Sequence, residues 1–141
     1  MANEGFIQLR VFCGPRNHSG LFVYIRIFST KREMLMALRT EGKAWGTGGF
    51  ENGTNGAMQT FKSRKRPGCI GCINLFRRGL TNEIVTHEFA HAMFAYGERK
   101  GLTGKWLQVG NTMPIEELYC YALGRMVARF GTRAQTLGLF Q

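Results

Sequence analysis

Apolar and polar residues alternate along two segments near the start of the chain, Phe6–Cys13 and Leu21–Phe28. Successive side chains of a strand point to opposite faces, so this pattern predicts two strands that each bury one face. The segment between them, residues 14–20, begins and ends with glycine and predicts a turn. Two further strands are predicted at Ala57–Lys62 and Ile70–Phe76. We therefore expect a small sheet of about four strands, antiparallel or mixed.

Helix end signals and apolar spacing predict three helices. Thr30, three positions before Glu33, forms a capping box for a short helix that Gly42 should end. The segment Thr81–Gly97 has a capping residue at its start and glycine at its end, and Pro114–Phe130 begins with a proline that suits the first helical position. This last helix is apolar on almost all of its faces, so we expect it to be buried. Without repeats or a linker, the chain is expected to form one α+β domain over all 141 residues.

The composition is that of a folded and strongly basic protein. Hydrophobic residues make up 44% of the chain, and 19 Lys and Arg against 9 Asp and Glu give a formal net charge of +10. No run of residues is long and apolar enough to span a bilayer, and the first residues lack the pattern of a signal peptide. We therefore expect a cytoplasmic protein without a membrane partner, whose four cysteines are reduced thiols.

The densest group of basic residues is the run Lys62–Arg66. A basic surface attracts polyanions or acidic proteins and speeds their encounter with the chain. No motif of a known nucleic-acid fold accompanies this charge, so a nucleic acid is the less favoured partner. A solvated turn is at least as good an interpretation of the run. The charge therefore adds one expectation, that a protein or peptide substrate would be acidic.

Cys69 and Cys72 form a single CxxC pair. A zinc ribbon needs a second such pair, and the sequence has none at that spacing. The two cysteines also fall at a predicted strand, whose alternation puts residues three apart on opposite faces. A metal site is therefore not expected at this pair.

The segment HEFAH, from His87 to His91, lies within the second predicted helix. Residues four apart lie one above the other on a helix, so the two imidazoles can bind one metal ion. Glu88 is rotated away from that line and can approach a water on the metal without being a ligand, which is the arrangement of metalloproteases. The sequence therefore predicts a zinc site with His87 and His91 as ligands and Glu88 as general base.

A catalytic zinc takes three protein ligands and keeps one position for water. The chain has no Asp and no His after His91, so the later candidates are Glu98, Glu116 and Glu117. Glu98 follows the motif too closely to fold back onto the metal. Glu116 and Glu117 begin a helix that should be buried. An unpaired carboxylate is costly in such a position, and binding to a metal removes that cost. Because the helix is apolar on most faces, its periodicity does not show which of the two residues is the ligand. His18, in the first turn, is interpreted as an exposed loop residue, with a role as electrophile as the alternative.

The segments THEFAHAMFAYG and PIEELYCYALGRM, which begin at Thr86 and Pro114, together resemble the small gluzincin-like zinc metallopeptidases of phages and mobile elements. These single-domain enzymes are related to the group that cleaves phage-type repressors. The resemblance covers Ile70–Phe130 and implies a zincin-like fold, in which the sheet packs on the HExxH helix and a C-terminal helix, with Zn²⁺ as cofactor. It also implies that Glu117 is the third ligand and that substrate adds as a strand to the sheet edge at Ile73–Phe76.

The motif and the resemblance together predict hydrolysis of a peptide bond, with Glu88 accepting a proton from water and returning it to the leaving amine. Tyr121 lies one turn beyond Glu117 on the same helix face and is the candidate donor to the oxyanion, with a core tyrosine as the alternative. Two other classes of function remain. One is a zincin-fold binding protein without peptidase activity, and the other is a basic protein that binds nucleic acid or a host factor. A phage-encoded chain of this kind would act in the cytoplasm of the host bacterium.

Overall fold

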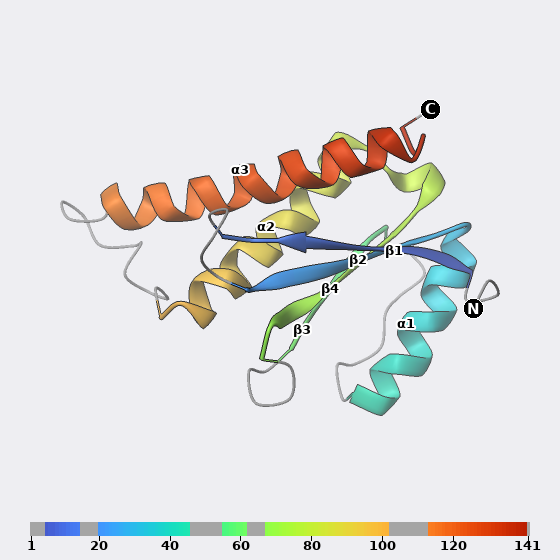
Figure 1. The fold of residues 1–141 in the computed structure, drawn as a ribbon. Coiled ribbons are helices and arrows are strands. Elements are labelled where there is room, and N and C mark those ends of the chain that lie inside the picture. The colour runs from blue at the N-terminus through green and yellow to red at the C-terminus, as the bar shows by residue number, and fades with distance from the viewer. Residues whose placement is uncertain (1–4, 15–19, 46–54, 62–66, 102–112, 141) are drawn as a thin grey trace.

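The computed structural model describes residues 5–14, 20–45, 55–61, 67–101 and 113–140, and of residues 42–45 and 113–116 the backbone alone. A four-stranded mixed sheet and three helices make up this part of the chain (Figure 1), which confirms the α+β class. The strands are β1 (Phe6–Phe12), β2 (Phe22–Phe28), β3 (Ala57–Thr60) and β4 (Cys69–Phe76). The helices are α1 (Lys31–Trp45), α2 (Asn82–Arg99) and α3 (Met113–Thr136), and a short 3-10 turn, η1 (Arg77–Gly79), follows β4.

The strands lie in the order β1-β2-β4-β3. β1 pairs with β2 and β3 pairs with β4 in antiparallel fashion, whereas β2 and β4 run parallel. Seven of the eight residues of β4 are buried, as an interior strand requires. The expected substrate edge at Ile73–Phe76 is therefore wrong, because β4 has β2 on one side and β3 on the other. Among the described strands, β3 is the edge on this side of the sheet.

Helices cover both faces of the sheet (Figure 1). The main hydrophobic core lies between one face and the helices α2 and α3. It includes Ile25 and Ile73 of the sheet and Phe89 and Met126 of the helices. A smaller cluster joins α1 to the opposite face; its members are Phe28, Met34, Leu35, Leu38 and Ala57. The α2 side of the sheet is therefore the side that carries the HExxH segment.

The first helix begins as predicted and ends later than predicted. The backbone N–H of Glu33 donates to Oγ1 of Thr30 at 3.1 Å, so the predicted cap is present. The helix then continues through Gly42 to Trp45, and the predicted end at Gly42 is wrong. A glycine inside a helix costs about 1 kcal/mol relative to alanine, which is small enough for the helix to continue.

The expectation that the last helix is buried is also wrong. One face of α3 packs inward, with Ala122, Met126 and Phe130 at most 1% exposed. Leu118 and Tyr121 lie on the other side and are 48% and 57% exposed. The helix is an outer layer with neighbours on one side, and the apolar residues on its remaining faces have no element of the described structure to pack against.

A buried polar network ties the edge strand to the rest of the sheet. Arg26 of β2 donates to Oδ1 of Asn74 at 2.8 Å and forms an ion pair with Glu41 of α1 through two hydrogen bonds of 2.5 Å. Asn74 of β4 donates in turn to the Gln59 side chain at 3.0 Å and to the Ala57 carbonyl at 3.3 Å, both on β3. The position of β3 therefore depends on side chains as well as on its backbone ladder with β4.

Candidate functional site

The helix α2 holds the HExxH residues in a fixed orientation. Its start is capped by Thr81, whose Oγ1 accepts from the backbone N–H of Ile84 at 3.2 Å. Glu83 lies in the first turn, where the helix dipole favours a carboxylate. Phe89 and Ala92 are fully buried in the core, which sets the rotation of the helix about its axis. This rotation turns the two histidines of the motif away from the core.

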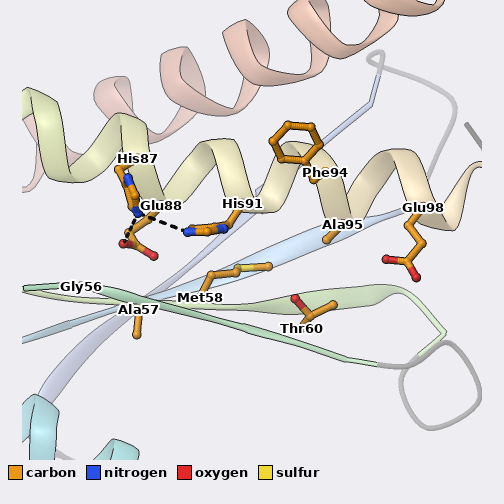
Figure 2. Close-up of a pocket in the computed structure, with 10 residues that line it drawn as sticks. All are labelled: Gly56, Ala57, Met58, Thr60, His87, Glu88, His91, Phe94, Ala95 and Glu98. Atoms are coloured by element: carbon orange, nitrogen blue, oxygen red, sulfur yellow. Dashed lines mark hydrogen bonds and ion pairs between the residues drawn. The ribbon is translucent and has the colours of Figure 1, made fainter. Parts of the chain in front are cut away.

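The imidazoles of His87 and His91 converge on the exposed side of α2 (Figure 2). Their Nε2 atoms lie 3.2 Å apart, with the ring planes at 80°. Two nitrogens bound at about 2.05 Å to one tetrahedral zinc lie about 3.3 Å apart, so the observed spacing fits one shared ion. Desolvation and, as a smaller effect, the neighbouring His87 lower the pKa of His91, which favours the neutral imidazole that binds metals.

Glu88 lies beside the histidines but is only 4% exposed. Its Oε2 is 4.0 Å from Nε2 of His87, and its Oε1 is buried without a hydrogen-bond partner among the described residues. Burial raises the pKa of Glu88, against a smaller opposite effect of His87. A buried carboxylate oxygen without a partner is costly, and a cation or a water next to the histidines would supply that partner.

These three residues line a cleft of about 470 Å³ between α2 and the edge strand β3 (Figure 2). Gly56 lies close to α2, since an added Cβ there would be 3.2 Å from Cγ of Glu88. A second, smaller cavity of about 230 Å³ is also lined by His87 and Glu88 and extends from them toward the first turn of α2. The space along α2 therefore extends to both sides of the histidine pair.

The far end of the cleft was missed by the sequence reasoning. Phe94 and Glu98 of α2 and Met58 and Thr60 of β3 line it. Glu98 is seven residues after His91, so helical spacing alone could have placed it on the same face, two turns further on. The two β3 residues could not have been found in this way, because no local pattern shows that β3 lies opposite α2.

The structure does not bring Glu117 or Tyr121 to the histidine pair. Within the described part of the chain, no three His, Cys, Asp or Glu side chains gather where they could hold a metal, and neither residue is found along the cleft. Glu117 is exposed. Tyr121 is also exposed, with the guanidinium of Arg125 5.4 Å from its ring centre. The side chain of Glu116 lies outside the described residues.

The remaining sequence predictions bear less on the cleft. His18 and the basic run Lys62–Arg66 lie outside the described residues. Cys69 and Cys72 are buried in β4, and neither forms a disulfide within the described residues. Burial raises the pKa of Cys72 to about 12, so its thiol is neutral at physiological pH.

No family model, curated protein or solved structure matches this chain. Across the residues that the structure describes, no helix is both long enough and apolar enough to cross a membrane. A functional assignment therefore depends on the chain's own residues, first of all on the convergent His87 and His91 and on the buried Glu88.

Proposed function

We propose that this chain is a zinc-dependent metallopeptidase with a zincin-like fold. The observation that carries the proposal is the convergence of the His87 and His91 Nε2 atoms at 3.2 Å beside the buried carboxylate of Glu88. The mixed sheet behind α2 and the C-terminal helix packed on α2 are consistent with the fold that the sequence resemblance implies.

The donor atoms suit zinc better than a hard cation. Neutral imidazole nitrogens are common zinc ligands, whereas Mg²⁺ and Ca²⁺ take oxygen ligands. The partnerless Oε1 of Glu88 is a further sign that the pocket beside the histidines is built for a polar occupant. Zinc, when bound there, lowers the pKa of a water molecule and polarises a carbonyl group.

Glu117 remains our proposed third ligand, as the resemblance implies, with Glu116 as the alternative. Both belong to the first turns of α3, which lie against the last turns of α2. The Tyr119 ring packs where a side chain at Gly97 would be, and it lies 6.1 Å from the ring of Phe94 at the cleft. Ligation by Glu117 therefore requires the start of α3 to move along this contact toward the histidine pair.

Glu88 performs the proton transfers of the proposed reaction. It takes a proton from the attacking water and delivers it to the leaving amine. Its raised pKa suits both steps, because an acid–base group works best when its pKa lies closer to the working pH. Tyr121 is the proposed oxyanion donor, and the movement that brings in Glu117 would have to bring it to the cleft as well. Substrate would add as a strand along β3, which replaces Ile73–Phe76 as the proposed edge.

A zincin-fold binding protein without peptidase activity is the second candidate. One observation favours it: among the described residues no third metal-binding side chain joins His87 and His91. Catalytic zinc sites use three protein ligands, so a site limited to two would hold the ion poorly. Zinc content and turnover together distinguish the two functions.

The decisive experiment compares the wild type with Glu88→Gln. We expect one zinc per chain in both proteins, because Glu88 is not a ligand, and peptide hydrolysis in the wild type alone. Proteomic comparison of cells that produce either protein would identify the substrate. The matched control is Glu33→Gln, which neutralises an exposed carboxylate in the first turn of α1 and should keep both zinc and activity.

Ligand variants test the site itself. Replacing His87 and His91 together by alanine should abolish zinc binding, and full zinc occupancy in that double variant would contradict the proposal. Glu117→Ala should lose zinc and Glu116→Ala should retain it. The reverse result would move the third ligand back by one residue.

A further inference from the structure

The cleft carries carboxylates on both sides of the histidine pair. Glu98, in the last turns of α2, lines the larger cavity, and Glu83, in the first turn, lines the smaller one. Both are exposed, and within the described residues neither takes part in an ion pair. Figure 2 shows the Glu98 side chain pointing from α2 toward the side of β3 that carries Thr60. No Lys or Arg is among the described residues that line the two cavities.

The chain as a whole has the opposite charge. Its formal net charge is +10, and it contains 9 carboxylate side chains, all of them Glu. Among the described residues, three of these, Glu83, Glu88 and Glu98, line the two cavities. Exposed charges act weakly beyond a Debye length of about 8–10 Å. A ligand in the cleft therefore interacts mainly with the charges closest to it, and the described lining supplies carboxylates and no Lys or Arg.

The helix rise sets the position of each end carboxylate along a bound peptide. Counted from the midpoint of the His87–His91 pair, Glu98 lies nine residues on and Glu83 six residues back, which corresponds to about 13 Å and about 9 Å along the axis. An extended chain advances about 3.3 Å per residue. Glu98 thus lies beside the position about four residues from a peptide bond held at the histidine pair, and Glu83 beside the position about three residues away on the other side. Phe94, between His91 and Glu98, adds an apolar surface to the part of the cleft that leads to Glu98.

We propose that this cleft selects cationic peptide segments, in which a Lys or Arg about four residues from the scissile bond pairs with Glu98. A second basic side chain, on the other side of the bond, pairs with Glu83. The position of the scissile bond rests on the proposed peptidase function, whereas the preference for positive charge does not depend on turnover. The net charge of the chain favours the opposite, an acidic substrate. Experiment can therefore separate the effect of the carboxylates at the cleft from the effect of the net charge.

Turnover with matched peptides is the first measurement. Peptides of equal length carry Lys, Gln or Glu at one position at a time on either side of the cleaved bond. We expect kcat/KM to fall in the order Lys, Gln, Glu, by about 2- to 5-fold per step, at the positions beside Glu98 and Glu83. Glu98→Gln should remove the discrimination on its side only and Glu83→Gln on the other, while Glu33→Gln on α1 should preserve both. Equal rates for the three peptides, or faster cleavage of the Glu peptide, would overturn the inference.

Equilibrium binding is the second measurement and requires no reaction. Fluorescence anisotropy of labelled Lys and Glu peptides at physiological salt should show tighter binding of the Lys peptide, and Glu98→Gln should reduce the difference. If the Lys preference holds while no peptide is cleaved, the peptidase proposal fails and the binding inference stands. If peptides are cleaved without charge preference, the peptidase proposal stands and the inference fails. Tighter binding of the Glu peptide in every variant would mean that the net charge governs recognition, which also overturns the inference.

Discussion

Removing the charge of Glu88 should stabilise the metal-free protein. The residue is 4% exposed, its Oε1 has no partner within the described chain, and burial raises its pKa. The folded state therefore binds the proton of this carboxyl more tightly than the unfolded state. Such a group contributes stability below its unfolded pKa, and this contribution is lost as pH rises through the folded pKa. At neutral and higher pH the ionised side chain opposes folding, and Glu88→Gln removes the charge while keeping the shape.

The size of the effect follows from the burial and from the missing partner. A buried polar group without a hydrogen bond costs about 1–3 kcal/mol, and a charged one costs more. Glutamine still leaves a neutral amide to be satisfied, so we expect a net gain of about 1–2 kcal/mol. For a domain of this length that is a rise in Tm of roughly 3–8 °C. The gain should be larger at about pH 8, where more of the wild-type carboxyl is ionised, than near pH 5.

Thermal unfolding in the presence of a chelator measures this effect at both pH values. Glu33→Gln is the control for loss of an exposed negative charge, and its stability should change by no more than about 0.5 kcal/mol. A lower Tm for Glu88→Gln at the higher pH would refute the reasoning. A gain that is larger in acid would refute it as well, because the linkage between the raised pKa and stability has the opposite sign.

Three other perturbations test the metal and the framework around the cleft. Zinc at about 100-fold above its Kd should stabilise the wild type by about 2.7 kcal/mol, and His91→Ala should abolish this gain in a thermal titration. Gly71→Ala directs a Cβ into a backbone oxygen of β3 and should lower the free energy of unfolding, measured by chemical denaturation, by about 1–3 kcal/mol. The control Gly124→Ala places its Cβ where no atom lies within 4 Å, so it should be neutral or stabilising by up to about 1 kcal/mol. Arg26→Met leaves the Glu41 carboxylate without its partner and should cost about 3–5 kcal/mol, part of which Glu41→Leu should restore in the double variant.

The features that depend on local interactions could be predicted from the sequence. Alternation placed the first strand at Phe6–Cys13, one residue longer than β1, and capping residues placed the second helix at Thr81–Gly97, close to the observed α2. The approach of His87 and His91 follows from helical spacing, so the histidine pair of the candidate site could be predicted without any tertiary structure.

Strand order could not be predicted in the same way. β2 and β4 pair in parallel through residues as far apart as Arg26 and Asn74, and no local pattern specifies this partnership. The edge next to the cleft was for this reason assigned to Ile73–Phe76 instead of to β3. Helical spacing places Glu83 and Glu98 on the face of α2 that carries the histidines, but no local pattern shows that β3 lies opposite this face and makes it one wall of a cleft.

The third ligand depends on tertiary packing in a further way. The sequence of a helix that is apolar on most faces does not show which face points to the core. In the structure Tyr119, Ala122 and Met126 face inward, and Glu117 is exposed. If Glu117 is the ligand, the first turns of α3 must shift, and the close contact between Tyr119 and Gly97 must change with them. Zinc binding and the packing of α3 on α2 then form one coupled equilibrium. The affinity for the metal would be lowered by the free energy of that rearrangement, so a substitution that loosens this contact acts on zinc binding without touching a ligand.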